Sequence, residues 1–452
     1  MARERNTRLA SVIAETGWSQ PRVAREMQTV AAENGIDELR ALDRSHIAHW
    51  VKGTRPGPSA AATLCEALTR GLRGVRTVTL AEIGLADHDA HVGPSWAGDP
   101  ATALTTLRDD MFARRQLLYS TAAAALPALT WWDSRPTVAR QNTPQQPPRV
   151  TAAHVDALHE AAAYFSGQDQ RLGGGTGRTA LRAFLATDVA AYLTAASGDI
   201  RPRLLSAAGE LTYLYGWMSF DAGDQAGAQK AFGVALALAA EADDPALAGH
   251  ILRAQGHQAG DLGHRRIALR YTEASVDSAR YRAAGPRERA LFGVVHARAL
   301  ASAGRKSDAL AALHRAEHDL DRADGEQAPA RAAFFGEAAL AHETGLTLRT
   351  LGDLPGAEKE LRRSVRTRAL PYARTHAVTI GYLGAVQAQS GRVEEACTTW
   401  HLALDAMTGI RSDRAAGVVR QMLSALSPLR GRGGSVAAAL DARAREALLA
   451  IG

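Results

Sequence analysis

The chain has 452 residues, of which 46% are hydrophobic but only 5% are aromatic. This length is sufficient for two or three domains, and the scarcity of aromatic and β-branched runs argues against a β-sandwich or barrel and favours packed helices. The net charge of +6 excludes a polycation that coats nucleic acid indiscriminately, but it is compatible with one basic site on a balanced surface.

The only two cysteines, Cys65 and Cys397, lie far apart and provide neither a disulfide framework nor a zinc-binding spacing. We expect a cytoplasmic protein, because a reducing compartment suits such a chain. The first 25 residues follow a helical pattern of charged and apolar positions, not that of a signal peptide. We therefore expect no membrane partner.

Four short amphipathic helices are predicted in residues 1–85, the first expected domain. Gly17 ends the first helix, Ser19 is the expected N-cap of the second, and Asp43 is the expected N-cap of the third, which stops at Gly53. The residues expected to form the core are Leu9, Val12 and Ile13, then Val23, Ala24 and Met27, then Ile47 and Trp50, and finally Leu64, Cys65 and Leu68.

Two stretches of this domain, GWSQPRVA (17–24) and DRSHIAHWVKGTRPGP (43–58), carry a family resemblance. They resemble the start of the second helix, and the recognition helix with its exit turn, of the Xre-type helix-turn-helix in phage-repressor-like regulators. One departure is the link QTVAAENGIDELRAL (28–42), which is much longer than the usual turn. Either the second helix is extended, or a loop intervenes.

The resemblance implies a DNA-binding surface, because the third helix of that family enters the major groove. It implies that the residues reading bases or adjacent phosphates are Arg44, Ser45, His46 and His49. The residues that it implies for holding the phosphate backbone are Gln20, Arg22, Lys52 and Arg55. Residues 1–80 contain 12 Lys/Arg and 8 Asp/Glu, an excess of 12 − 8 = +4. The alternative is a solvated helix face or a helix-turn-helix used for protein contact.

Residues 86–150 are expected to form a linker that contains one helix at about 100–132. Its second part, 133–150, is rich in proline and glutamine and is expected to be extended. The stretch RRQLLYSTAAAALPALTWW (114–132) is similar to a twin-arginine export signal, but it begins more than a hundred residues into the chain. Its apolar part is also shorter than the roughly 20 residues that a membrane-spanning helix needs. We expect a buried or interfacial helix there.

Residues 151–452 contain a helical repeat. Five turns share the form Gly-x4-Ala, with glycines at Gly223, Gly263, Gly304, Gly352 and Gly391, spaced 40, 41, 48 and 39 residues apart. Seven residues before each turn glycine the residue is small, and nine after it the residue is usually large. This pattern predicts antiparallel helix pairs that cross closely at the small residues, while the large residue fills the gap to the next pair. The longest spacing predicts an insertion near 321–329.

The repeat spacing over roughly 200–410 resembles the tetratricopeptide repeat, with a helical pair before it and a capping helix after it. We therefore predict an all-α protein, a helix-turn-helix domain followed by a tetratricopeptide-like α-solenoid. In such arrays the first helix of each pair lines the concave face. The resemblance implies a basic, aromatic groove that suits a peptide, a small carboxylate-bearing molecule or an acidic protein segment. The residues that it places in this groove are Tyr213, Trp217, Arg253, His257, Arg298, His342 and Arg349.

Other motifs are weaker. LGGGTGRTAL (172–181) suggests a phosphate-binding loop, but Arg178 stands where the lysine is needed and no strand precedes it, so a flexible loop between helices is expected. His250, His257 and His264 are spaced seven apart, but no further ligand completes a metal site. We find no catalytic constellation, and we expect neither an enzyme nor a bound cofactor or metal.

Together these features resemble actinobacterial regulators and, in layout, peptide-sensing transcription factors of Gram-positive bacteria. We expect a sequence-specific transcriptional regulator that binds double-stranded DNA. Its repeats would mediate homodimerisation and sense a peptide, small-molecule or protein effector. The alternative is a scaffold that binds another regulatory protein and uses the helix-turn-helix for protein contact.

Overall fold

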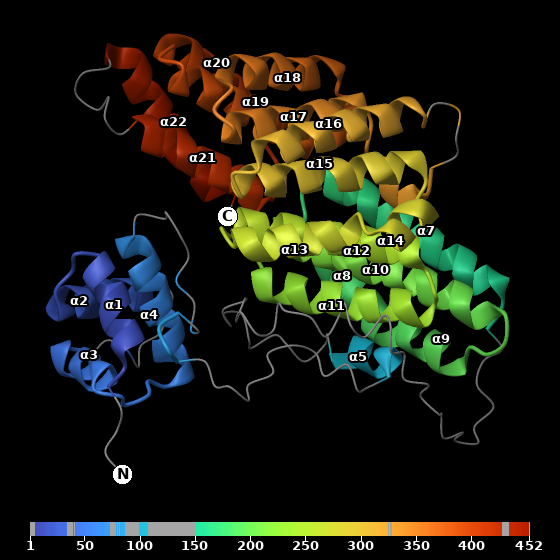
Figure 1. Cartoon of the computed structure of the whole chain (residues 1–452), viewed down its shortest axis with the longest axis horizontal. Helices are drawn as coiled ribbons and strands as arrows, with labels where there is room; N and C mark the ends of the chain where they lie inside the picture. Colours follow the sequence, from blue (N-terminus) through green and yellow to red (C-terminus); the bar gives the residue numbers. More distant parts are fainter. Residues whose placement is uncertain are drawn as a thin grey trace.

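The computed structural model describes residues 5–33, 39, 41–72, 78, 80, 82–85, 99–106, 150–323, 325, 328–426 and 434–451. Helices account for all the regular secondary structure in these residues (Figure 1), and the all-α prediction is confirmed. None of the described helices combines the length and apolar character needed to cross a lipid bilayer.

The N-terminal helices are α1 (Thr7–Glu15), α2 (Gln20–Glu33), α3 (Arg44–Val51) and α4 (Pro58–Gly71). They share one hydrophobic core, in which all the apolar residues predicted from the four helical patterns are buried. Asn6 caps α1 by accepting from the Leu9 amide, and its Nδ2 donates to the Ile83 carbonyl at 2.8 Å. The start of the bundle is thereby tied to the segment that follows α4.

The long link between the second and third helices is in part helix. Helix α2 continues to Glu33, so the first of the two alternatives holds for its described part. Residues 34–38 and 40 lie outside the described residues. At the far end of the link, Gln28 Nε2 donates to the Leu42 carbonyl at 2.6 Å. This bond fastens the residue before Asp43 to α2.

The predicted linker is described only at α5 (Pro100–Thr106), whose Leu104 is buried in the core of the following helices. The remainder of the helix expected to reach 132, including the segment 114–132 that is similar to an export signal, lies outside the described residues.

The C-terminal part is an array of antiparallel helix pairs (Figure 1). It begins with α7 (Ala152–Leu172) and then α8 (Arg178–Phe184) and α9 (Ala190–Ala195), which are joined by a π-helical turn at Leu185–Val189. The pairs that follow are α10 (Ile200–Asp221) with α11 (Gln225–Glu241), α12 (Pro245–Asp261) with α13 (Arg265–Ser275), α15 (Pro286–Ser302) with α16 (Lys306–Asp321), α17 (Glu337–Thr350) with α18 (Leu354–Thr367), α19 (Ala373–Gln389) with α20 (Val393–Ala406), and α21 (Asp413–Leu426) with α22 (Gly434–Ile451).

The five predicted turns join the helices of five pairs. Each turn glycine has a positive φ, between 78° and 84°, which is a conformation that glycine adopts without steric cost. Between the pairs, the chain forms the short helix α14 (Ser278–Ala283), which the repeat pattern did not predict, and 3-10 turns at Ala330–Ala332 and Leu370–Tyr372. The extra chain of the longest spacing lies between α16 and α17, as expected.

The small residue seven before each turn glycine allows close helix crossing. A Cβ added at Gly216 would lie 2.7 Å from Phe232, and one at Gly384 would lie 2.6 Å from Trp400. In each case the large residue packs against the glycine of its own pair. The prediction placed this residue at the gap to the next pair, and the structure shows that the turn also brings it face to face with the glycine of its own pair.

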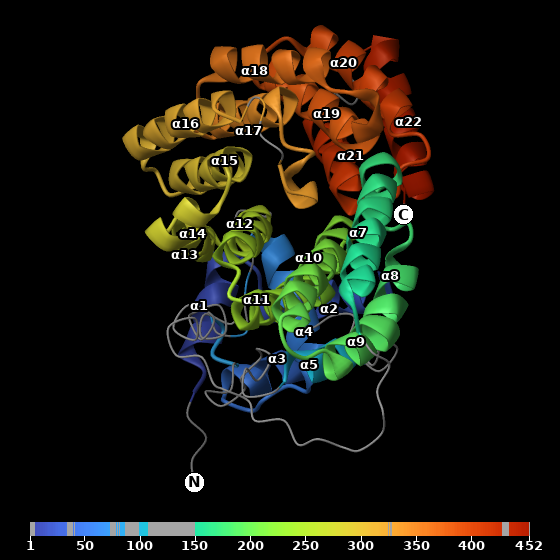
Figure 2. The same ribbon diagram turned by 90° about the vertical axis from the view of Figure 1, so that its right-hand side faces the viewer.

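The array closes on itself, since its first helix α7 lies against both α10 and α19 (Figure 2). The glycine loop after α7 is part of this closure and is not the flexible loop that we expected. The Arg411 amide donates to the Leu172 carbonyl at 2.7 Å, and the Gly174 amide donates to Asp221 Oδ2 at 2.9 Å. A Cβ at Gly173 would lie 2.3 Å from the Arg411 carbonyl oxygen, so close backbone contact requires glycine here.

A buried ion cluster fixes the closure. Arg374 of α19 contacts Asp169 of α7 at 2.9 Å and Asp221 of α10 at 2.8 Å, and all three side chains are at most 2% exposed. Ser412 Oγ donates to Asp221 Oδ1 at 3.0 Å. Burial raises the pKa of Asp169 to about 6. The positive charge of Arg374 opposes this shift, and the negative charge of Asp221 adds to it.

Candidate nucleic-acid interface and central cavity

Helix α3 begins with a capping arrangement at Asp43. The Asp43 carboxylate accepts from the backbone amides of Ser45 and His46, and the Ser45 hydroxyl donates to the same oxygen at 2.6 Å. Hydrogen bonds from the side chains of Ser45 and then His46 hold the pKa of Asp43 well below its usual range. The first turn of α3 therefore presents its amides and side chains around a fixed carboxylate.

One face of α3 is buried and the other is exposed. Ile47, Trp50 and Val51 lie in the core, while Arg44, Ser45, His46 and His49 are exposed, as the sequence predicted. Arg44 and His49 form no hydrogen bond or ion pair with a described residue. Ser45 and His46 form hydrogen bonds with Asp43, so only the remaining hydrogen-bonding capacity of each side chain is available to an external partner.

The predicted backbone-holding residues lie at the start of α2 and just after α3. Arg22, Lys52 and Arg55 are exposed and Gln20 is partly buried. The Arg22 guanidinium carbon lies 4.9 Å from the centroid of the Trp18 ring, a cation–π contact that restricts the arginine side chain.

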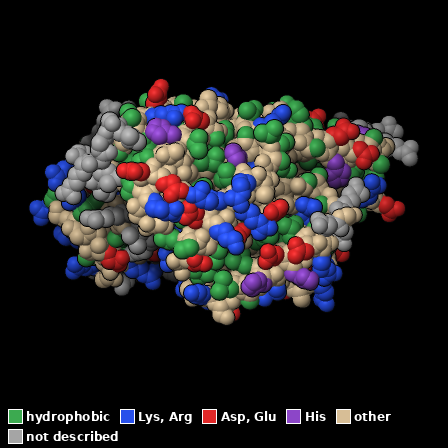
Figure 3. All heavy atoms as spheres, turned by 90° about the horizontal axis from the view of Figure 1, so that it is seen from above, with side chains coloured by type: hydrophobic (Ala, Val, Ile, Leu, Met, Phe, Trp, Pro, Cys, Tyr) green, Lys and Arg blue, Asp and Glu red, His purple; other side chains and the backbone are tan. Residues whose placement is uncertain are grey.

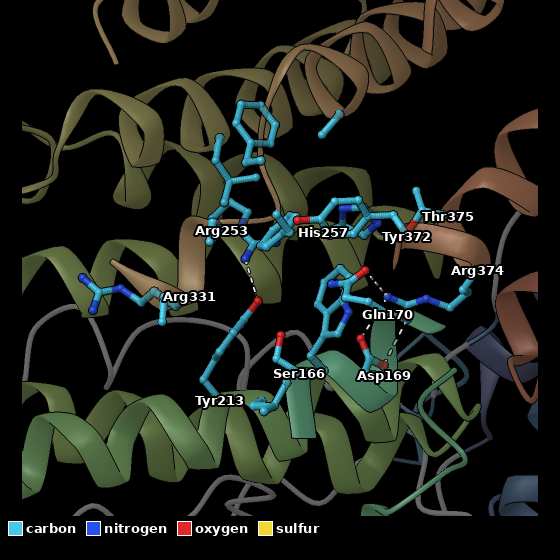
Figure 4. Close-up of a pocket in the computed structure, with 18 of the residues that line it drawn as sticks. Ser166, Asp169, Gln170, Tyr213, Arg253, His257, Arg331, Tyr372, Arg374 and Thr375 are labelled. Carbon is cyan, nitrogen blue, oxygen red and sulfur yellow. Dashed lines mark hydrogen bonds and ion pairs between the residues drawn. The ribbon is translucent and has the colours of Figure 1, made fainter. Parts of the chain in front are cut away.

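A cavity of about 310 Å³ lies on the inner side of the closed array (Figure 4). It is lined by the first helices of the pairs, by α7 and by the segment 330–335. Five of the seven predicted groove residues line it: Tyr213, Trp217, Arg253, His257 and His342. In Figure 4, Tyr213 and Asp169 approach from one side, Arg253 and His257 from the opposite side, and Arg374 from a third.

The other two predicted residues, Arg298 and Arg349, line a second cavity of about 520 Å³. On α15 and α17 they lie C-terminal to the residues of the same helices that line the first cavity, such as Val295 and His342, and Arg414 borders both cavities. Arg298 contacts Asp261 at 2.5 Å and Glu343 at 3.7 Å. Burial lowers the pKa of Arg298, but these carboxylates more than offset that effect and raise it. The single predicted groove is thus two cavities.

In the 310 Å³ cavity the lining carboxylates all have ion-pair partners, but some of the lining arginines do not. Each lining carboxylate has an ion-pair partner: Asp169 with Arg374, Glu210 with Arg331, and Glu343 with Arg298. By contrast, three of the five lining arginines have no carboxylate oxygen of a described residue within 4 Å. These three are Arg253, Arg368 and Arg414.

The three unpaired arginines have other contacts. Arg253 donates to the Tyr213 hydroxyl at 2.8 Å, and Arg368 donates to the Ala338 carbonyl at 2.8 Å. The Arg414 guanidinium carbon lies 5.6 Å from the centroid of the Trp217 ring. Burial lowers the pKa of Arg368 to about 10, against the weaker attraction of Glu343. These contacts hold the guanidinium groups in place and leave their charges without close compensation.

His342 is a neutral acceptor in this cavity. Burial lowers its pKa to about 3, and the charges of Arg368 and Arg414 act in the same direction. Thr379 Oγ1 donates to the Thr375 carbonyl at 2.6 Å, so it accepts from His342 Nδ1 at 2.8 Å. The proton is therefore on Nδ1, and the Nε2 lone pair is free to accept.

Sequence reasoning missed Arg331, Arg368 and Arg414. Arg331 and Arg368 lie in connections between pairs, where the repeat pattern gives no position. Arg414 lies on α21, a first helix whose pair was not counted among the five repeats. If α21 and α22 had been treated as a sixth helix pair, and not α22 alone as a cap, Arg414 would have been placed on a first helix and so among the groove residues.

The array also carries basic residues on its outer surface. Helices α18 and α20 lie uppermost in Figure 1, and Figure 3 shows that side with basic and acidic side chains intermixed. On these helices, Arg362 and Arg392 each form ion pairs with both Glu358 and Glu395. Because these charges are compensated locally, this surface is a weaker candidate for nucleic acid than α3.

Comparison with known protein families gives a match in the N-terminal bundle. The family model of the SP15 N-terminal domain matches residues 9–86, which is 86 − 9 + 1 = 78 of the 452 residues. The matched segment spans α1 to α4 and therefore concerns the bundle that carries the candidate interface. No curated protein matches the chain.

Proposed function

We propose that this protein is a sequence-specific DNA-binding transcriptional regulator, with an Xre-type helix-turn-helix and a tetratricopeptide-like array that dimerises and senses an effector. The observation that carries the proposal is the division of α3 into a buried face and an exposed face. Ile47 and Trp50 fix the helix in the bundle, and Arg44 and His49 project from it without partners among the described residues. A recognition helix needs this combination.

Arg44 is the strongest candidate for base reading. A guanidinium binds guanine in the major groove through two hydrogen bonds, whereas serine and histidine discriminate less between bases. Arg22 of α2, with Lys52 and Arg55 after α3, supplies exposed cations that suit phosphate contacts. The location in the cytoplasm and the dimer belong to the proposal: one small bundle contacts too few base pairs for specific binding, and two bundles on adjacent half-sites double the readout.

The first experiment selects DNA from a random duplex library with the full-length protein. The expected result is an enriched motif with two half-sites. Binding should weaken with salt by a slope of about −0.9 for each phosphate that is neutralised. If four cations of each bundle contact phosphate, the slope for a dimer is about −7. A scaffold that uses α3 for protein contact would enrich no sequence at low salt.

A matched pair of variants tests the role of α3. Arg44→Ala should relax the preference at one position of each half-site and lower affinity by about 1–3 kcal/mol. Arg420→Ala removes an exposed arginine of α21 that pairs with Asp413 in the array, and it should leave DNA binding unchanged. Equal effects of the two substitutions would contradict the assignment of α3.

A further inference from the structure

The 310 Å³ cavity contains polar atoms that the described residues do not satisfy. The Nε atoms of Arg253, Arg368 and Arg414 are buried donors without a partner, and His342 Nε2 and Glu343 Oε2 are buried acceptors without one. Buried polar atoms in native proteins are almost always hydrogen-bonded. Donors and acceptors left unmet around one cavity indicate a ligand that supplies both kinds of partner.

The charges around the cavity favour an anion. Every lining carboxylate has an ion-pair partner, whereas Arg253, Arg368 and Arg414 have none within 4 Å among the described residues. Burying a cation without a counterion is costly, and an anion that enters recovers that free energy. A carboxylate matches the planar guanidinium group through paired hydrogen bonds.

Two of these arginines share one aromatic ring. The guanidinium carbons of Arg253 and Arg414 lie 5.4 Å and 5.6 Å from the Trp217 ring centroid, so they are at most 5.4 + 5.6 = 11.0 Å apart. Both arginines and Trp217 line the same cavity, so a ligand in it that lies against the indole has both guanidinium groups nearby. Trp217 is partly buried, so its fluorescence also reports on occupancy.

Part of the remaining wall is apolar and the space is small. Leu214, Leu291, Val295 and Phe334 line the cavity, and its volume of about 310 Å³ is at the lower end of the range for small-molecule sites. Helix α7 lies across the inner side of the array and contacts α10 and α19. This arrangement suits a compact molecule better than an extended peptide, which needs an open groove along successive repeats.

We infer that the central cavity binds a small organic carboxylate that has an apolar body and a hydrogen-bond donor. Its carboxylate pairs with Arg253 and Arg414, its body lies against Trp217 and the aliphatic wall, and its donor meets His342 Nε2. The inference rests on the proposed function only in identifying this ligand as the effector, because binding to the array does not require DNA.

The test is calorimetric titration of the full-length protein with 3-(4-hydroxyphenyl)propanoate, which has all three features. We expect saturable binding at millimolar or lower concentration, accompanied by a change in tryptophan fluorescence. The primary amide of the same acid lacks the charge and should bind about 10- to 100-fold more weakly. The analogue without the phenolic hydroxyl should bind several-fold more weakly.

Variants of α21 give the matched control. Arg414→Gln should weaken binding of the acid about 10- to 100-fold and abolish the preference for the acid over the amide. Arg420→Gln, on the same helix but exposed and paired with Asp413, should bind like the wild type. An unchanged thermal transition in both variants shows that the array is intact. If Arg414→Gln does unfold, Arg253→Gln replaces it with the same expectation.

Three results would overturn the inference: no binding of the acid at millimolar concentration, equal binding of acid and amide, or equal binding by the wild type and the intact arginine variant. Capture of an extended peptide in place of the acid would also overturn it. Titration of Arg44→Ala separates the two proposals, since this variant should bind the acid normally. Acid binding without any DNA binding would refute the proposed function alone.

Discussion

Replacing Arg374 with methionine tests whether the buried ion cluster holds the array closed. Arg374 is 2% exposed and contacts Asp169 at 2.9 Å and Asp221 at 2.8 Å. Methionine keeps much of the volume but leaves two buried carboxylates facing each other without a cation. Breaking a buried pair in this way costs about 3–5 kcal/mol, and for a domain of this size about 2 °C of melting temperature is lost per kcal/mol. We therefore expect the array transition to fall by about 6–10 °C at pH 7.5.

The pH dependence of this loss of stability tests whether the loss is electrostatic in origin. The pKa of Asp169 is already raised to about 6 with Arg374 present, and removing the guanidinium raises it further. The native variant then binds more protons than the native wild type as the pH falls from 7.5 to 5.5, so the difference in stability between them shrinks. Asp169→Asn added to Arg374→Met should restore part of the stability at pH 7.5. Calorimetry at both pH values measures these effects. A loss below about 1 kcal/mol, as for a surface ion pair, or a loss independent of pH, would refute the reasoning.

Two further predictions concern packing and protonation. Gly384→Ala places a Cβ 2.6 Å from the Trp400 ring and should destabilise the array by about 1–3 kcal/mol. The control is Gly167→Ala in α7, where a Cβ meets nothing within 4 Å. This control should be neutral or should stabilise the array by up to about 1 kcal/mol. Equal melting temperatures for the two variants would contradict the crossing geometry. Burial lowers the pKa of His250 and of His342 to about 3, so each neutral histidine favours the native state above pH 6.5. As the pH falls from 6.5 toward 3, the free energy of unfolding decreases by up to about 1.4 kcal/mol per pH unit for each histidine. Denaturant titrations of the wild type and His250→Gln should show a shallower acid loss in the variant, and parallel curves would contradict the buried neutral histidine.

Local patterns were sufficient to predict the N-terminal bundle and the helix pairs. A helical period of 3.6 residues identified Leu9, Met27 and Trp50 as core residues, and turn glycines such as Gly223 marked where pairs reverse. Both signals come from interactions within a few tens of residues. The contact of Phe232 with Gly216 of its own pair was not predicted, because spacing alone does not say which helix a side chain meets.

The closure and the composition of the cavity depend on contacts between distant residues. Asp169 and Arg374 are separated by 205 positions, and no local pattern relates them. The glycines after Leu172 predicted flexibility, although in the structure they allow two backbones to touch. Arg298 was assigned to the same groove as Arg253, but it pairs with Asp261 and lines the second cavity. Position along a helix does not separate the two cavities, because His257 and Arg298 both lie four residues before the last residue of their helices (261 − 257 = 4 and 302 − 298 = 4) and only His257 lines the first.

The most direct test of the central claim is genome-wide occupancy of the full-length wild-type protein compared with Arg44→Ala at equal expression. The account predicts discrete wild-type sites that share a motif with two half-sites, and loss or relaxation of that motif in the variant, because Arg44 is exposed on the recognition face of α3. Absence of enriched sites for the wild type, or identical sites for both proteins, would contradict it.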